Sequence, residues 1–107
     1  MKLVAVILTF NEELHLSRCI ASVQSVATDV VVADCFSTDE TLEIAHRYGA
    51  RVIQNPWVCH AAQFNWALGQ LDADTDWVLR LDADEVLSPA LVAEIQAALP
   101  SIGSEVD

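Results

Sequence analysis

Glycine is scarce in this sequence, and its three positions are Gly49, Gly69 and Gly103. None of them lies in the turn between the first expected strand and the helix that follows it, so a G-x-G-x-x-G turn and a G-x-x-x-x-G-K-S/T loop are both absent. Their absence excludes a Rossmann dinucleotide site and a P-loop nucleotidase, because both hold phosphates on a glycine-rich backbone. It also disfavours a nucleotidyltransferase that has a glycine-rich phosphate loop after its first strand.

Basic residues are also few, with 5 Lys and Arg against 16 Asp and Glu and a formal net charge of -11. Such a chain repels nucleic acid and anionic lipid, so we expect no nucleic-acid partner. Cys19, Cys35 and Cys59 form no C-x-x-C pair, and we expect reduced thiols in a cytoplasmic protein, with a zinc site at Cys59 and His60 as the less favoured alternative. The apolar run from Leu3 to Leu8 is too short to cross a bilayer.

The pattern of apolar residues predicts a strand followed by a helix four times, which indicates one α/β domain with a mostly parallel sheet and helices on its faces. In the predicted helices, Asn11 caps the first, Ser37 or Thr38 caps the second, and Ser88 and Pro100 bound the last. The expected strands cover residues 2–10, 29–35, 51–55 and 76–82, and the expected helices cover residues 11–26, 37–50, 60–71 and 88–100.

The tetrapeptide Leu-Asp-Ala-Asp occurs twice, and the expected sheet distinguishes the two copies. Asp72 and Asp74 precede a strand, where turn formation and solvation explain them. Asp82 and Asp84 follow the fourth strand at the sheet edge where α/β proteins bind ligands, and residues two apart on extended backbone point the same way. Two carboxylates converging around Ala83 need a cation, and oxygen ligands suit Mg²⁺ or Mn²⁺. A strand that ends in solvated acids is an equally weighted alternative.

Polar residues also follow the first two expected strands, and parallel strands bring all of these residues to one edge. Thr9, Asn11 and Glu12 end the first strand, while Asp34 ends the second and Asp39 follows it. Their convergence predicts a cleft whose usual occupant is a nucleotide. Because no glycine-rich loop is present, a metal ion on the acidic pair would have to neutralise a diphosphate.

Four segments, in this order and spacing, resemble the family-2 glycosyltransferases of the GT-A fold: ILTFNEE, VVADCFSTDET, AAQFNWAL and WVLRLDADE. The segments FSTDET, QFNWAL and LRLDADE are most similar to the branch that includes glucosyltransferases of lipopolysaccharide core assembly. The resemblance covers nearly the whole chain. It implies a GT-A, Rossmann-like, mostly parallel sheet with helices on both faces, truncated to the nucleotide-binding half.

The resemblance also implies roles for individual residues around a nucleotide-sugar donor. Asp84 would ligate the Mg²⁺ or Mn²⁺ that bridges the two phosphates, and Asp82 would reach the ribose or, through water, the metal. Thr9, Asn11 and Glu12 match the loop that lines the nucleoside pocket.

In the second half of the site, Asp34 matches an acid that contacts the base or ribose, and Asp39 belongs to the same motif. Asn65 matches an asparagine on the helix that borders the donor. Cys35 stands where many members have a second acid, and Phe64 stands where many have an arginine that contacts phosphate.

Arg80 lies two residues before Asp82 and therefore points to the same side of its strand. It could replace the phosphate contact that Phe64 cannot make. A structural ion pair with Asp82 or Asp76 is the equally weighted alternative.

The activity that the resemblance implies is transfer of a sugar, with inversion, from a nucleotide diphosphate donor to a glycan or lipid-linked acceptor. We expect a UDP-sugar and a role in cell-envelope polysaccharide or lipopolysaccharide synthesis, in the cytoplasm or peripherally at the cytoplasmic face of the inner membrane. An inverting transfer needs a carboxylate base, and we expect that base beyond Asp107. The alternative is a truncated, non-catalytic nucleotide-binding remnant or an interaction module.

Residues 1–107 would then be the nucleotide-sugar-binding part of one glycosyltransferase domain, without its acceptor half. Part of the apolar stripe on the last helix would be exposed in such a chain, and it could drive self-association. The stripe consists of Leu91, Ile95, Ala98 and Leu99.

Overall fold

The computed structural model describes the backbone of residues 2–56, 60–71 and 73–106, and the side chains in these ranges except those of residues 60, 61 and 98–106. Four strands form one sheet in the order β3-β2-β1-β4, and all three pairings are parallel. The strands are β1 (Leu3–Thr9), β2 (Asp29–Asp34), β3 (Arg51–Gln54) and β4 (Trp77–Asp82). The helices are α1 (Leu16–Val23), α2 (Thr41–Arg47), α3 (His60–Leu68) and α4 (Pro89–Val106).

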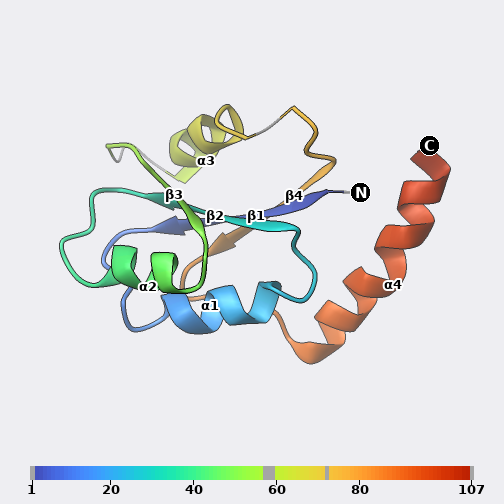
Figure 1. Ribbon diagram of the computed structural model, residues 1–107, viewed down its shortest axis with the longest axis horizontal. Coiled ribbons are helices and arrows are strands. Elements are labelled where there is room, and N and C mark those ends of the chain that lie inside the picture. The colour runs from blue at the N-terminus through green and yellow to red at the C-terminus, as the bar shows by residue number, and fades with distance from the viewer. Residues whose placement is uncertain (1, 57–59, 72, 107) are drawn as a thin grey trace.

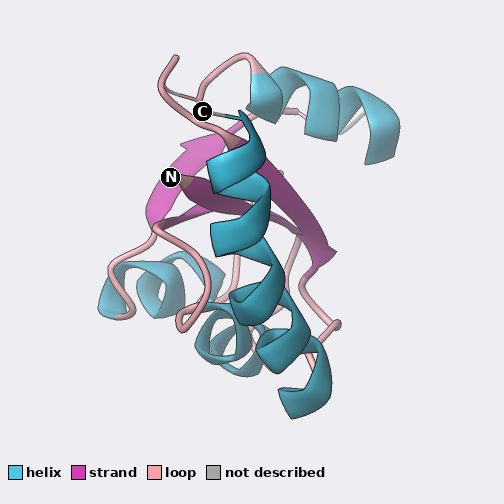
Figure 2. Ribbon diagram, turned by 90° about the vertical axis from the view of Figure 1, so that its right-hand side faces the viewer, coloured by secondary structure: helices cyan, strands magenta, loops and turns pink. Residues whose placement is uncertain are grey.

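Helices cover both faces of the sheet, as the sequence predicted (Figure 1, Figure 2). On one face, Leu16, Ile20 and Val23 of α1 and Ile44 of α2 pack against strand residues that include Ile7. On the other face, Ala67 of α3 packs against Val4, Val6 and Leu8 of β1, and Phe64 and Trp66 lie at the margin of that cluster. All seven residues of β1 are buried, because this strand has a neighbour on each side and a core on each face.

Two of the predicted helix caps are wrong. The helix α1 begins at Leu16 rather than just after Asn11, and Asn11 adopts a φ of 51°. The N–H groups of Asn11, Glu12 and Glu13 bind side chains of Ser37, Thr41 and Asp39 instead, so the first helical hydrogen bond is the one from the Leu16 N–H to the Glu12 carbonyl at 2.9 Å. Neither Ser37 nor Thr38 caps α2; the Asp39 carboxylate accepts a hydrogen bond from the Thr41 N–H at 2.9 Å.

The last helix begins as predicted, with Pro89 in its first position and Ser88 Oγ accepting a bond from the Leu91 N–H at 3.1 Å. The prediction that Pro100 ends it is wrong, because α4 continues to Val106. A proline inside a helix removes one main-chain hydrogen bond, and here it does not end the helix.

The apolar stripe of α4 is only partly covered. Val92 and Ile95 pack against the core cluster that includes the buried residues of α1, whereas Leu91 is 42% exposed. The side chains of Ala98 and Leu99 lie outside the described residues. The far end of α4 extends away from the sheet (Figure 1). Within the described residues, no helix is both long enough and apolar enough to cross a membrane.

Candidate functional site

The parallel register brings the predicted site residues to one edge of the sheet. Thr9 pairs with Asp34 on β2, and Leu8 pairs with Asp82 on β4, so all these strands end at the same level. We call this edge the carboxyl edge. Because the three strands share one direction, polar residues far apart in the sequence meet there.

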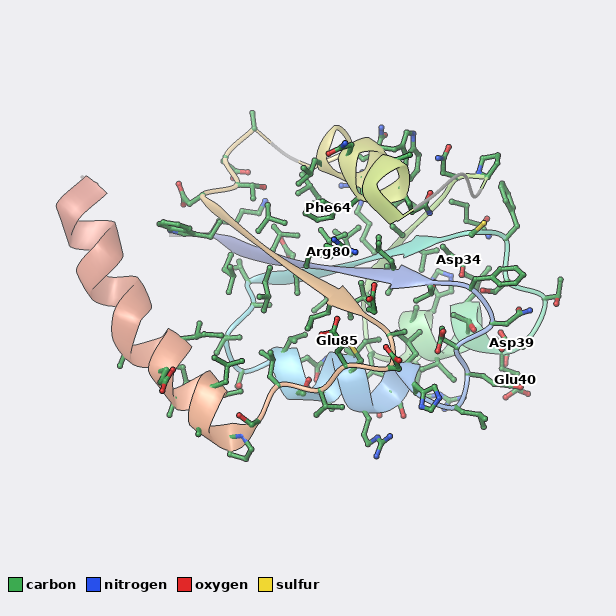
Figure 3. All side chains as sticks on the ribbon, turned by 180° about the vertical axis from the view of Figure 1, so that it is seen from behind. Asp34, Asp39, Glu40, Phe64, Arg80 and Glu85 are labelled. Atoms are coloured by element: carbon green, nitrogen blue, oxygen red, sulfur yellow. The ribbon has the colours of Figure 1, made fainter. Side chains whose placement is uncertain are left out.

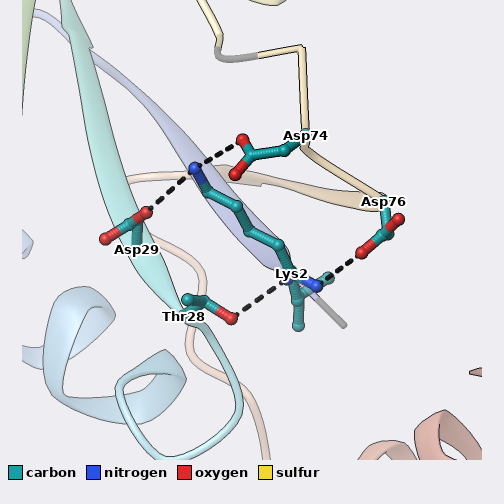
Figure 4. A network of polar contacts seen from close by, with 6 residues as sticks. Lys2, Thr28, Asp29, Asp74 and Asp76 are labelled. Carbon is teal, nitrogen blue, oxygen red and sulfur yellow. Dashed lines mark hydrogen bonds and ion pairs between the residues drawn. The ribbon is translucent and has the colours of Figure 1, made fainter.

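The first Asp-Ala-Asp copy lies at the opposite edge, as predicted for Asp74. Its carboxylate lies 3.0 Å from Lys2 Nζ, and Asp29 lies 3.6 Å from the same nitrogen. Asp76 accepts a bond from the Lys2 N–H at 2.7 Å, and this network joins β1, β2 and the segment before β4 (Figure 4). Asp72 lies outside the described residues.

A pocket of about 540 Å³ opens at the carboxyl edge. It brings together four of the predicted site residues, namely Thr9, Glu12, Asp82 and Asp84. The complete lining is Leu8, Thr9, Phe10, Glu12, Cys35, Asp82, Ala83 and Asp84. The remaining predicted residues, which are Asn11, Asp34, Asp39, Asn65 and Arg80, lie outside this lining.

Asp34 is fully buried behind the pocket wall and already uses both carboxylate oxygens. Thr9 Oγ1 donates to Oδ1 at 2.7 Å, and the Ser37 N–H donates to Oδ2 at 2.7 Å. Ser37 Oγ and Gln54 Nε2 add further bonds at 2.5 and 3.2 Å. Asp34 therefore ties the ends of β1, β2 and β3 together.

Asn11 and Asp39 belong to a pair of loops, residues 10–15 and 35–40, that bind each other across the ends of β1 and β2. We call this pair the loop clamp. Asn11 donates its N–H to Ser37 Oγ and accepts a bond from the Thr38 N–H, both at 2.8 Å. The Glu13 N–H donates to Asp39 at 3.3 Å. These residues shape the pocket wall by fixing the loop that carries Glu12.

Burial and the acidic surroundings of the pocket raise the pKa of two groups, the Glu12 carboxyl and the Cys19 thiol. Burial raises the pKa of Glu12; His15 opposes the shift, and the negative charges of Asp84, Asp39 and Asp82 add to it. Burial also raises the pKa of the Cys19 thiol to about 12, with Glu85 and Asp84 contributing. Several acids thus share one small space, which is the environment that favours a bound cation.

Asp39 behaves differently because it is held by hydrogen bonds. Its slight burial favours the neutral form, but the Thr41 side chain and N–H and the Glu13 N–H all donate to the carboxylate. These bonds outweigh burial and lower the pKa of Asp39 below its ordinary value of 3.8.

Asp82 presents its two oxygens to different surroundings. Oδ1 is buried and has no hydrogen-bond partner within the described part of the chain, and its closest cation is Arg80 Nη2 at 3.9 Å. The side chain as a whole is 41% exposed and lines the pocket, so the exposed oxygen is Oδ2. The Asp82 N–H donates to Glu85 Oε1 at 2.8 Å, which stabilises the turn that leads to Asp84. Of the two alternatives for Arg80, the ion pair with Asp82 is present.

The donor set of the pocket fits a divalent cation. Asp82 and Asp84 line one cavity, and the exposed oxygen of Asp82, Oδ2, is open to it. Carboxylate oxygens suit Mg²⁺ or Mn²⁺, which retain several ligands from water or phosphate. Over the described residues, no group of three His, Cys, Asp or Glu side chains could hold a metal ion by itself. Water and phosphate oxygens would complete the coordination that these described residues begin.

The helix α3 contains one buried polar residue that the sequence did not lead us to expect, Gln63. Gln63 is 1% exposed, and its Oε1 accepts a bond from Asn55 Nδ2 at 3.3 Å, next to the end of β3. Asn65 lies on the exposed side of α3, away from the pocket lining. The Phe64 ring lies 5.5 Å from the Arg80 guanidinium carbon. The signal available in the sequence was a glutamine within an otherwise apolar face of the predicted helix.

Comparison with known proteins identifies the family. Residues 4–105 match the family model described as Glycosyl transferase family 2. The chain is 41% identical over 95 residues to a protein of Rickettsia bellii named an uncharacterized glycosyltransferase, covering 89% of this chain and 32% of that protein. It is 35% identical over 96 residues to the lipopolysaccharide core biosynthesis glycosyltransferase LpsC of Rhizobium meliloti, covering 85% and 34%.

Two solved structures share the fold. S. aureus TarS (residues 1–349) superposes with a TM-score of 0.78 at 25% identity, covering 94% of this chain and 33% of that one. Glucosyl-3-phosphoglycerate synthase from Mycobacterium tuberculosis in complex with UDP gives a TM-score of 0.66 at 25% identity, covering 79% and 34%. The chain therefore has the GT-A fold and belongs to the family 2 glycosyltransferases. It spans about a third of the length of the curated relatives it matches.

Proposed function

We propose that this chain forms the donor-binding part of a glycosyltransferase that transfers a sugar from a nucleotide diphosphate donor, with UDP as the nucleotide. The acceptor is a glycan or a lipid-linked saccharide, and the transfer inverts the anomeric centre. The likeness to LpsC supports a role in lipopolysaccharide or other cell-envelope polysaccharide synthesis at the cytoplasmic side of the inner membrane. The UDP bound to the mycobacterial synthase supports the choice of nucleotide.

The observation that carries this proposal is the shared pocket of Asp82, Asp84, Thr9 and Glu12 at the carboxyl edge. In open α/β sheets this edge is where nucleotides bind. No glycine-rich loop follows β1, so the turn after this strand offers no glycine-rich cradle for phosphates. An anionic diphosphate can enter so acidic a pocket only together with positive charge.

Each residue has a defined part in the proposed site. Asp84 and the exposed oxygen of Asp82 hold Mg²⁺ or Mn²⁺, and Asp82 also orients the ribose. When bound, the ion supplies the positive charge that stabilises a departing diphosphate. Thr9 and Glu12 line the nucleoside side of the pocket.

The remaining predicted residues act around the pocket in this proposal. Asn11 and Asp39 fix the loop that carries Glu12, through the bonds of the loop clamp. Asp34 holds Thr9 and the end of β2 in place behind the nucleoside. Asn65, which is exposed on α3 outside the pocket lining, would border only a part of the donor that extends beyond the pocket. We propose that residues outside this chain supply the acceptor site and the carboxylate base that an inverting transfer requires.

The test is the metal dependence of UDP binding, measured by titration calorimetry on the full chain. We expect binding with Mn²⁺ or Mg²⁺ and none in EDTA, and Asp84→Ala should lower affinity on the order of a hundredfold, since it removes a direct ligand. Asp74→Ala is the matched control, because it deletes the same charge at the opposite sheet edge. Equal binding with and without EDTA would refute the proposal.

The same titration separates the enzyme from the non-catalytic remnant. Metal-dependent binding of UDP together with sugar transfer supports the enzyme. The remnant is supported if UDP binds in a metal-dependent way but no sugar is transferred to any glycan or lipid-linked acceptor. This transfer assay uses a protein as long as the family's longer members.

A further inference from the structure

A cation beside the acidic pocket is held between α3 and β4. The Arg80 guanidinium rests over the Phe64 ring, with 5.5 Å between its carbon and the ring centroid. Nη2 of the same side chain lies 3.9 Å from Asp82 Oδ1. Figure 3 shows Phe64 and Arg80 on the same side of the sheet. The ring, the guanidinium and the carboxylate therefore form a row that ends at the pocket.

The two ends of this row constrain the arginine in different ways. An aromatic face attracts a guanidinium within about 6 Å of its centroid, so Phe64 limits where the Arg80 head can go. At 3.9 Å the nitrogen is too far from Asp82 for a hydrogen bond, yet close enough for charge attraction. The Asp82 oxygen that faces Arg80 is buried and has no hydrogen-bond donor among the described residues.

The two oxygens of Asp82 therefore face different partners. Oδ1 faces the arginine and is closed to solvent, so the carboxylate is turned with Oδ2 toward the pocket. Deleting the guanidinium would leave Oδ1 buried without a nearby positive charge, and the carboxylate would rotate to bring that oxygen to water. The arginine thus holds the Asp82 carboxylate in the orientation that binds the metal, although Arg80 does not itself line the pocket.

We infer that Arg80, held against the Phe64 ring, is a positioning residue that orients the Asp82 carboxylate and supplies local positive charge for a nucleoside diphosphate. This inference rests on the proposed function. Arg80 lies on β4, the strand that also carries Asp82, and Phe64 on α3 contacts the guanidinium group.

The positive charge of Arg80 should act in opposite directions on the binding of Mn²⁺ and of UDP. A fixed cation repels a divalent metal ion and attracts a diphosphate. Replacing Arg80 with methionine, which keeps much of the apolar stem, should change binding of Mn²⁺ alone by less than about threefold, because the lost charge repulsion offsets the lost orientation of Asp82. The same change should weaken binding of UDP at saturating Mn²⁺ by about tenfold, through lost charge and lost orientation.

The experiment measures Mn²⁺ affinity by electron paramagnetic resonance and UDP affinity at saturating Mn²⁺ by calorimetry, on the full chain. Arg80→Lys should recover much of the charge effect but only part of the UDP affinity, because an ammonium group cannot match the guanidinium's planar contact with the ring. Phe64→Leu keeps the apolar volume and should weaken UDP binding by roughly threefold. Arg51→Met is the charge-matched control, since Arg51 is exposed on the other edge strand.

A double exchange, Phe64→Arg with Arg80→Phe, tests the row itself. It reverses the two partners and should restore part of the UDP affinity lost in Arg80→Met. Equal weakening of Mn²⁺ and UDP binding in Arg80→Met, or no change in either, would overturn the inference. Wild-type protein that binds no UDP with Mn²⁺ would instead overturn the proposed function, so the two failures are distinguishable.

Discussion

Replacing Asp34 by asparagine tests whether this buried acid organises the pocket or touches the ligand. Its carboxylate accepts bonds from Thr9 Oγ1, the Ser37 N–H, Ser37 Oγ and Gln54 Nε2. Asparagine has nearly the same shape but presents an NH₂ group where one oxygen stood. That group confronts donors, so at least one of them is left without an acceptor.

The magnitude follows from these contacts. The new amide would turn its oxygen toward the Ser37 N–H and the Gln54 amide, because a main-chain N–H can only donate, and its NH₂ group would face the two hydroxyls. The hydroxyls would accept from that group, so the Thr9 hydroxyl proton would lose its acceptor, and a buried donor without a partner costs about 1–3 kcal/mol. Losing the charge from the other bonds adds about 1 kcal/mol, so we expect a total of roughly 3 kcal/mol. For a chain of this size that corresponds to a fall in Tm of roughly 15 °C.

The assay combines urea denaturation with UDP titration at a temperature where both proteins are folded. Thr9→Val is the comparison variant, because it removes a single donor to Asp34 and should cost about 1 kcal/mol. We expect the loss of folding free energy in Asp34→Asn to exceed the loss of UDP binding free energy. An unchanged unfolding midpoint with a large loss of UDP affinity would show that Asp34 acts by direct ligand contact.

Two further predictions concern acid stability and thiol reactivity. Because the folded pKa of Asp39 is lowered, its contribution to stability is present above its ordinary pKa of 3.8 and is lost as the pH falls through the folded value. The urea midpoints of wild type and Asp39→Asn should therefore converge as the pH is lowered from about 6 to about 2, and a constant gap would contradict this. In a Cys59→Ser background, Mn²⁺ with UDP should slow alkylation of Cys35, which lines the pocket, and an unaltered rate would place the nucleotide elsewhere. Cys19, fully buried and with its pKa raised to about 12, should react only on unfolding.

Much of the fold could be predicted because the chain alternates apolar strands and amphipathic helices. The parallel arrangement followed from that alternation, and it brought Thr9 and Asp82 to one edge without any knowledge of side-chain contacts. The choice of the second Asp-Ala-Asp copy used the same rule, and Asp82 and Asp84 do share a pocket. These conclusions depend on strand direction and on the side-chain alternation of extended backbone.

Side-chain partnerships between distant segments could not be predicted in the same way. The expected caps at Asn11 and Ser37 failed because these residues bind each other across 26 positions of sequence instead of their own helices. The buried Asp34 on β2 likewise depends on hydrogen bonds from Thr9 on β1 and Gln54 on β3. Local preference favoured caps, and tertiary contacts overrode it.

The amino-acid sequence alone determined which strands run parallel and which edge of the sheet gathers the acids, because apolar periodicity and strand direction are local properties. Only the tertiary structure decided that Asp34 is sealed behind the pocket and that Arg80 stands between Phe64 and Asp82. Hydrogen bonds and charge pairs depend on distances of a few ångström between segments, and those distances exist only once the helices have packed on the sheet.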